Sequence, residues 1–318
     1  MELVLDTNDD EIRSPQDFSS SLETGCSQKE APICFDCQPL NGNIVFKDVW
    51  FAYPSRPQQD VLRGFSLVVP ENSVVAVLGE SGSGKSTLAS LLLRFYDPAK
   101  GTIEVGNVDI YKHPPAWIRS LVGVVNQEPT LFAMTIEDNI LYSKLTHQAL
   151  HLPTSRDPKN EMSKLLEASN CVEFLKAFPD GLSTYVGERG VSLSGIRISA
   201  YFVILASLAC RVQSLFSGGQ KQRICLARAL ARHPRFLILD EATSALDTRS
   251  ETIVHQQLHQ ATKNTTTIII THRLSTLKYA DYIAVLANGQ LSQFGARSEV
   301  LRSPGEALHR ILSSQSAT

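Results

Sequence analysis

A glycine-rich loop set between a strand and a helix is the feature that most constrains this chain of 318 residues. The run VVAVLG, from Val74 to Gly79, is wholly apolar and ends in glycine, as expected of a buried parallel strand. GESGSGKST comes next, and STLASLLLRFY then has helical spacing. Strand, loop and helix in this order identify the pattern GxxxxGK[ST] as a phosphate-binding loop rather than a glycine- and serine-rich turn that happens to contain lysine.

The residue types of this loop have separate chemical tasks. Glycines let successive backbone N–H groups converge on phosphate oxygens, and the helix N-terminus adds its dipole. Lys85 brings a positive charge to the β- and γ-phosphates, and the Ser86 hydroxyl can ligate Mg²⁺. The residues expected to contact nucleotide here are Gly79, Ser81, Gly82, Ser83, Gly84, Lys85, Ser86 and Thr87.

A second apolar run, FLILDE, supplies the acidic partners of the loop. Asp240 stands at the carboxyl end of this buried strand, directed at the metal, and Glu241 follows it. A carboxylate at Glu241 can polarise an attacking water. A buried strand that merely ends in two surface acids is the alternative. Loop and acids together predict that the chain binds a nucleoside triphosphate with Mg²⁺.

The order of apolar runs predicts an α/β fold with a mainly parallel central sheet. RFLILDEA and TTTIIITH read as two further buried strands, and helices alternate with them. Apolar runs between Thr135 and Arg232 have helical spacing, which predicts a helical subdomain over about 135–232. Residues 1–41 are rich in Ser, Asp, Glu and Gln without apolar periodicity, and we expect a disordered leader there.

Composition argues against several other classes of protein. The net charge of −2 gives no basic excess for nucleic acid or an anionic membrane surface. Cys34 and Cys37 form a CxxC without a second pair at zinc-site spacing. The longest apolar run, Ala200 to Cys210, has about half of the roughly 20 residues that a membrane helix needs. We expect the chain by itself to be soluble.

Further motifs give a resemblance to a known family. NQEP with Gln127, SGGQKQR from Ser217, SALD with Asp247 and THRLST with His272 follow one another in the order used by the nucleotide-binding domain of ABC transporters. FAYPSRP, VGERG and LARALARHPRFLILDEATSALD resemble the B-type exporters, a group of multidrug, peptide and mitochondrial or plastid half-transporters. The resemblance covers 42–318 and implies a P-loop NTPase core with an N-terminal antiparallel β subdomain and an inserted α-helical subdomain.

The resemblance also implies roles for single residues. Tyr53 would stack on adenine, Gln127 would reach the metal and the water, and His272 would contact the γ-phosphate. The alternatives are a strand-end core tyrosine, a solvated loop glutamine and a core histidine with satisfied hydrogen bonds. The implied catalytic set is Glu241, His272, Gln127 and Lys85, and the implied metal set is Ser86, Gln127 and Asp240.

Two kinds of partner are implied. Ser217, Gly218 and Gly219 precede a helix, so their amides form a second anion site. In the family this site, with Gln220, faces the γ-phosphate bound by another subunit, and Asp247 lies at the same seam. Two ABC ATPase domains, as homodimer or heterodimer, would thus sandwich two ATP molecules head to tail. The second partner is the transmembrane domain, which Glu188 and Arg189 of VGERG would contact unless they are a solvated charge pair.

An insertion interrupts the signature motif. Removing residues 196–218 would join Ser194-Gly195 to Gly219-Gln220 and restore VSLSGGQKQR. Three interpretations stand: a retained intron, a genuine loop or helix that leaves Ser217 to Gln220 as the working signature, and a regulatory or membrane-touching element. Phe216 also replaces the leucine that usually precedes the signature serine. If these residues are translated, we expect ATP binding to survive and ATPase activity to fall.

The leading interpretation is the ATPase motor of a membrane exporter. Because no run of the chain spans a membrane, we expect a truncated half-transporter, membrane-associated through a missing domain at a cytosolic or organelle-matrix face. A soluble ABC ATPase acting on DNA or ribosomes is disfavoured by the single cassette and the lack of heptads or a basic patch. A truncated or mis-spliced product that binds ATP but is inactive is the third possibility.

Overall fold

The computed structural model describes residues 42–148, 158–186, 216–243, 246 and 248–315. The chain divides into two compact units, Met1–Pro39 and Leu40–Thr318, and all described residues belong to the second. The expected leader, the apolar run from Ala200 to Cys210 and the Glu188–Arg189 pair lie outside the described residues. Within the described part, no helix is both long and apolar enough to span a bilayer.

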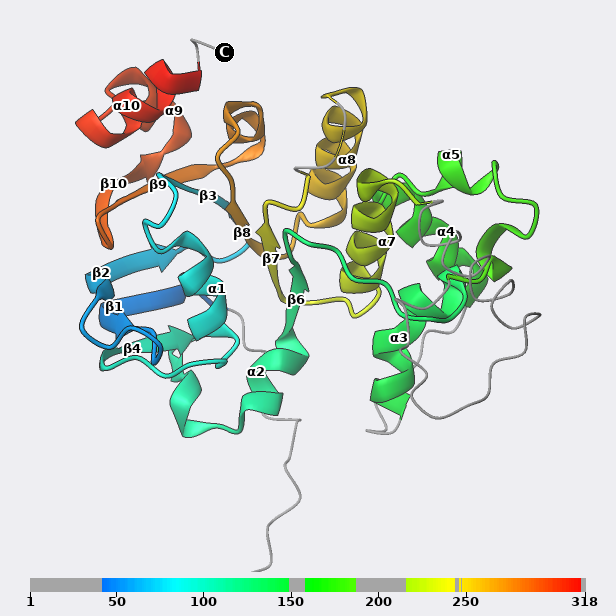
Figure 1. The fold of residues 1–318 in the computed structure, drawn as a ribbon, viewed down its shortest axis with the longest axis horizontal. Helices are drawn as coiled ribbons and strands as arrows, with labels where there is room; N and C mark the ends of the chain where they lie inside the picture. The colour runs from blue at the N-terminus through cyan, green and yellow to red at the C-terminus, as the bar shows by residue number, and fades with distance from the viewer. Residues whose placement is uncertain (1–41, 149–157, 187–215, 244–245, 247, 316–318) are drawn as a thin grey trace, which may run out of the picture. The chain divides into compact units, whose positions relative to one another are not determined.

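A six-stranded sheet forms the centre of the described unit (Figure 1). Its strand order is β10-β9-β3-β8-β7-β6. The strands are β3 (Val74–Gly79), β6 (Val122–Val125), β7 (Phe236–Asp240), β8 (Thr266–Ile270), β9 (Tyr282–Ala287) and β10 (Gln290–Ala296). All pairs are parallel except β9 with β10. Every residue of β3 and β8 is buried, which confirms the prediction of a parallel sheet covered on both faces.

A second, four-stranded sheet is antiparallel and precedes most of the first in sequence. Its order is β2-β1-β4-β5, with β1 (Ile44–Ala52), β2 (Asp60–Val69), β4 (Lys100–Val105) and β5 (Val108–Asp109). The buried side chains of β1 and β2, among them Phe46 and Phe65, share one hydrophobic core with α1 and one face of the parallel sheet. The antiparallel β subdomain implied by the resemblance is therefore confirmed.

The helices fall into two groups by position in the sequence. Those around the sheets are α1 (Lys85–Leu92), α2 (Pro115–Leu121), α8 (Thr248–Ala261), α9 (Arg297–Arg302), α10 (Glu306–Gln315) and the 3-10 turns η1 (Ile110–Lys112) and η3 (Leu274–Tyr279). Those between β6 and β7 are α3 (Ile136–Gln148), α4 (Pro158–Ala168), α5 (Val172–Leu175), η2 (Gly181–Ser183) and α7 (Gly218–Leu230). In Figure 1 the second group gathers beyond β6 and β7.

Asn139 joins the loop after β6 to the helices that follow it. Its side chain is fully buried, accepts a hydrogen bond from the Phe132 N–H (2.8 Å) and donates to the Thr135 carbonyl (2.9 Å). Arg228 of α7 donates to the Asn139 side chain (2.6 Å) and backbone carbonyl (2.8 Å). One amide therefore fixes the loop, α3 and α7 together.

We expect Asn139→Ala to lower the free energy of unfolding by about 2–3 kcal/mol, because it leaves buried backbone groups of the loop and one N–H group of Arg228 without their partner. Denaturant unfolding monitored by circular dichroism measures this. The matched control is Asn264→Ala in an exposed turn, which should change stability by less than about 0.5 kcal/mol. Equal losses in both variants would contradict the role assigned to Asn139.

Candidate functional site

The loop between β3 and α1 depends on glycines at two kinds of position. Gly82 and Gly84 have left-handed backbone angles, with φ of +78° and +102°. Gly79 is needed for space instead, since a Cβ there would come within 2.7 Å of the Leu286 carbonyl oxygen. A loop with this curvature directs its N–H groups inward, which is the geometry that the motif predicts for phosphate oxygens.

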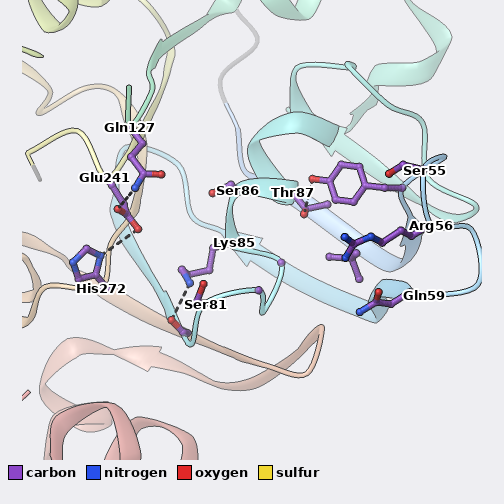
Figure 2. Close-up of a pocket in the computed structure, with 15 residues that line it drawn as sticks. Ser55, Arg56, Gln59, Ser81, Lys85, Ser86, Thr87, Gln127, Glu241 and His272 are labelled. Atoms are coloured by element: carbon purple, nitrogen blue, oxygen red, sulfur yellow. Dashed lines mark hydrogen bonds and ion pairs between the residues drawn. The ribbon is translucent and has the colours of Figure 1, made fainter. Parts of the chain in front are cut away.

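Lys85 lies folded over this loop (Figure 2). Its Nζ atom donates to the carbonyl oxygens of Gly79 (2.9 Å) and Glu80 (2.8 Å). Burial lowers the pKa of Lys85, and the nearby charges of Glu241 and Asp240 oppose that shift. Two neutral carbonyls compensate a buried ammonium only partly, so the residue is well placed to accept an anion as a stronger partner.

Asp240 ends β7 directly below the loop. Burial raises the pKa of its carboxyl group, while a hydrogen bond from Ser86 and the charge of Lys85 act in the opposite direction. Its Oδ1 atom is buried and has no hydrogen-bond partner among the described residues. A buried carboxylate oxygen left in this way is costly, and together with the Ser86 hydroxyl it forms the hard oxygen donor set that Mg²⁺ prefers. The residues present therefore fit the cation.

Glu241 is held by residues from two other segments (Figure 2). The Gln127 side chain donates through Nε2 to one carboxylate oxygen (2.8 Å), and Nδ1 of His272 lies 3.2 Å from the other. The Glu241 backbone is left-handed, with φ of +47°, and its N–H donates to the Ile270 carbonyl at the end of β8 (2.9 Å). This conformation costs a non-glycine residue about 1–2 kcal/mol, which the surrounding contacts must offset.

Tyr53 lines the same cavity as Glu241 and contacts Thr87, which Figure 2 shows at the opposite end of the site from Glu241. Its hydroxyl is 3.0 Å from the Thr87 hydroxyl, and its ring packs edge-on against Phe51 and Tyr96. These contacts fix the orientation of the ring. Because part of the ring remains exposed toward the site, it offers a face on which a planar base can stack.

These residues line one cavity of about 720 Å³. The predicted residues that line it are Tyr53, Gly79, Ser81, Gly82, Gly84, Lys85, Ser86, Thr87, Gln127, Glu241 and His272. Asp240 does not line it and acts on it through Ser86, and the Ser83 side chain is buried toward a smaller neighbouring cavity instead. Asp247 lies outside the described residues.

Four further residues line the cavity without having been predicted from the sequence, namely Ser55, Arg56, Gln59 and Val61. Ser55, Arg56 and Gln59 lie in the proline-broken loop between β1 and β2, and Val61 is the second residue of β2. A cationic residue just after the expected base-stacking tyrosine was the available signal, because arginine in a nucleotide site commonly contacts oxygen anions. The loop thereby closes the Tyr53 end of the cavity.

The signature residues form the start of α7. The Ser217 hydroxyl accepts a hydrogen bond from the Gln220 N–H (3.3 Å), and the Gln220 side chain accepts one from the Ser217 N–H (2.9 Å). This reciprocal pair is a capping box, and it leaves the backbone of Gly218 and Gly219 at the helix N-terminus. None of Ser217, Gly218, Gly219 and Gln220 lines the cavity of its own chain.

Phe216, the departure from the usual leucine, is accommodated in the helical core. Its side chain is buried and stacks on Phe178 at a centroid distance of 5.0 Å.

Comparison with known proteins now decides the family. The family described as "ABC transporter" matches residues 62–244, more than half of the chain. The chain belongs to the ABC transporter family. It is the ATP-binding domain of such a protein, homologous to those of B-type exporters.

The relatives of this ABC domain include mitochondrial proteins. It is 43% identical to the "Mitochondrial potassium channel ATP-binding subunit" of Xenopus tropicalis over 85% of this chain and 35% of the relative. It is 40% identical to "ATP-binding cassette sub-family B member 10, mitochondrial" of Mus musculus over 89% of this chain and 36% of the relative. The chain thus spans about a third of these relatives.

A solved structure, "Structure of a bacterial Atm1-family ABC exporter with ATP bound", is similar to this ABC domain with a TM-score of 0.72 and 34% identity. The match covers 87% of this chain and 43% of that one.

We expect Asp240→Asn to weaken Mg-ATP binding by about tenfold and not to weaken ATP binding in EDTA, because the substitution would remove a proposed metal ligand but no phosphate contact. Titration of a fluorescent ATP analogue with and without Mg²⁺ measures both affinities. Asp180→Asn, on an exposed turn, is the control and should change neither. A similar loss in EDTA would argue against Asp240 as a metal ligand.

Proposed function

We propose that this ABC domain binds ATP with Mg²⁺ in the cavity described above and hydrolyses it as the motor of a B-type exporter. The observation that carries the proposal is the convergence of Lys85, the Ser86–Asp240 pair and Glu241 on one site. Residues 42–318 would form the motor domain, with a helical subdomain over about 135–232 and a leader over 1–41.

The binding step uses charges that the fold leaves poorly compensated. Lys85 would exchange the Gly79 and Glu80 carbonyls for phosphate oxygens, and the loop amides would donate to the same oxygens. Ser86, Asp240 and Gln127 would hold Mg²⁺, which neutralises charge that develops on the phosphates. Tyr53 would stack on the base, while Arg56 and Gln59 contribute to the same end of the cavity.

The hydrolytic step requires a water to be oriented and polarised. Glu241 would accept a hydrogen bond from that water and draw proton density from it. Gln127 and His272 hold the two oxygens of the Glu241 carboxylate, so its direction is set before nucleotide binds. His272 would contact the γ-phosphate through a ring nitrogen.

The proposed partners are a second ABC ATPase domain and a transmembrane domain. The α7 N-terminus, formed by Ser217 to Gln220, would supply backbone donors to ATP held by the other domain, and Asp247 would lie at the same seam. Nucleotide binding would bring two domains together head to tail, and hydrolysis would separate them. The transmembrane domain would attach this assembly to a membrane at its cytosolic or organelle-matrix face.

Glu241→Gln should bind Mg-ATP with near-normal affinity and accumulate as a dimer, because binding is retained while hydrolysis is slowed. Size-exclusion chromatography with light scattering, at several protein concentrations with and without Mg-ATP, measures the dimer. Glu71→Gln, an exposed loop residue, should remain as the wild type. Lack of Mg-ATP affinity would overturn the motor assignment. Affinity without a dimer would instead support an inactive product.

Deleting residues 196–218, which joins Gly195 to Gly219, should raise ATPase turnover and leave Mg-ATP affinity unchanged. The reason is that AYFVILASLAC within this stretch is apolar, and such a run beside the signature helix disturbs association with another domain. Leu193 would then take the place of Phe216 before the signature.

The control for the deletion replaces residues 196–215 with a Gly-Ser linker of equal length. This variant distinguishes the effect of the apolar side chains from the effect of the length of the insertion. Steady-state phosphate release compares the three proteins. Equal turnover in all three would contradict an inhibitory role of the insertion.

A further inference from the structure

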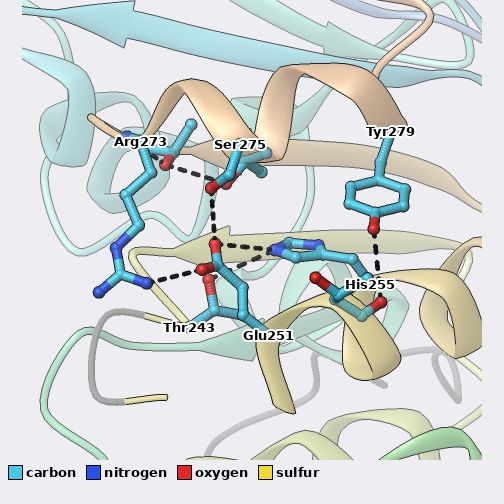
Figure 3. A network of polar contacts seen from close by, with 9 residues as sticks. Thr243, Glu251, His255, Arg273, Ser275 and Tyr279 are labelled. Atoms are coloured by element: carbon cyan, nitrogen blue, oxygen red, sulfur yellow. Dashed lines mark hydrogen bonds and ion pairs between the residues drawn. The ribbon is translucent and has the colours of Figure 1, made fainter. Parts of the chain in front are cut away.

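A polar cluster whose centre, Thr243, Glu251 and His255, is buried lies next to the site without lining it (Figure 3). We call it the Glu251 cluster, and its members are Thr243, Glu251, His255, Arg273, Ser275 and Tyr279. Glu251 and His255 come from α8, and Thr243 stands two residues after Glu241. Arg273 and Ser275 follow His272 directly in sequence. The cluster therefore joins the two segments that carry Glu241 and His272.

Glu251 is hydrogen-bonded to the segment that carries His272. Its side chain is only 6% exposed. One carboxylate oxygen accepts from the Arg273 guanidinium (2.8 Å) and the other accepts from the Ser275 hydroxyl (3.0 Å). The backbone of Arg273 is also held, since its N–H donates to the Thr271 hydroxyl (3.0 Å). Hydrogen bonds to side chains therefore hold the segment that directly follows His272.

His255, one turn after Glu251 on α8, contacts the segment that carries Glu241. Its Nε2 atom lies 3.3 Å from the Thr243 hydroxyl and 3.8 Å from a Glu251 oxygen, and its ring stacks on Tyr279 at 5.0 Å. Burial lowers the pKa of His255 to about 4, so its imidazole is neutral at pH 7. The charge of Glu251 is therefore balanced in the cluster by Arg273 and not by His255.

We propose that Glu251 is a positioning residue for ATP hydrolysis. Its hydrogen bonds to Arg273 and Ser275 tie the segment after His272 to α8, and His255 of the same helix contacts Thr243 in the segment after Glu241. In this way it keeps Nδ1 of His272 within 3.2 Å of the Glu241 carboxylate. It touches no nucleotide, because it does not line the cavity. This inference rests on the proposed function, since it concerns the same reaction.

The Glu251–Arg273 ion pair contributes to the position of its neighbours rather than to stability. A buried ion pair contributes little net stability, because desolvation of both charges opposes their attraction. It does define direction, since the charged hydrogen bond from Arg273 and the second hydrogen bond from Ser275 fix the segment that they join to Glu251. The left-handed backbone of Glu241 also persists only where neighbouring contacts determine it, and Thr243 is the cluster member nearest to it in sequence.

Glu251→Gln tests the proposal in the full chain, because it removes the charge opposite Arg273 and preserves size and the oxygen facing Ser275. We expect kcat for ATP to fall at least tenfold, with KM and Mg-ATP affinity within about twofold of the wild type. Hydrogen–deuterium exchange in nucleotide-free protein should become faster at 271–277 and 241–243 and stay unchanged at 80–92.

Glu306→Gln is the matched control, because it breaks the exposed Glu306–Arg310 ion pair (3.3 Å) on α10 by the same chemical change. It should leave kinetics and exchange at 241–277 unchanged. Ser275→Ala is a milder second variant that keeps the buried ion pair, and it should lower kcat about two- to fivefold without a change in KM.

A normal kcat in a folded Glu251→Gln protein would overturn the proposal. It would also be overturned if kcat fell together with Mg-ATP affinity while hydrogen–deuterium exchange rose throughout the domain, because that is the result of general destabilisation. If the wild type does not hydrolyse ATP, the proposed function fails by that measurement alone. The exchange data still decide the positioning claim in that case, because unchanged exchange at 271–277 would refute it.

Discussion

Parallel pairing of β3, β8 and β7 is the constraint on which the site depends. These strands are neighbours in the sheet, so their carboxyl ends lie along one edge. The register pairs Val77 with Ile270 and Asp240 with Ile270, which sets the ends of the three strands almost level. The phosphate loop, the acids and His272 therefore leave the sheet at one place, although about 190 residues separate the first from the last.

The electrostatics of the site follow from that convergence. Burial disfavours the charge of Lys85 and that of Asp240, and each charge partly offsets the penalty of the other. Neither is fully compensated, since Lys85 relies on loop carbonyls and Asp240 keeps a buried oxygen without a partner. A phosphate anion and a metal cation together would remove both deficits, which supports the proposed binding of Mg-ATP.

Glu241 connects this edge to the rest of the chain through two separate networks. On one side, Gln127 belongs to a loop that Asn139 and Arg228 fasten to α3 and α7. On the other side, His272 precedes residues that the Glu251 cluster fastens to α8. A movement of the helices between β6 and β7, or of α8, therefore has a direct path of contacts to the carboxylate that the proposed reaction uses.

The sequence by itself determined the fold class and most of the residues that line the cavity, because apolar runs set the strands and the glycine-lysine-serine loop is a known phosphate-binding pattern. Tertiary structure decided what depends on packing between distant segments: the contacts of Gln127 and His272 with Glu241, the buried oxygen of Asp240 and the cavity wall at Arg56 and Gln59. The Glu251 cluster was also invisible in the sequence, because its members have no recognisable spacing until α8 packs beside the segment after His272. The local pattern of apolar residues decides which helices and strands form. Which side chains of distant elements contact one another depends instead on burial and on the register of the strands.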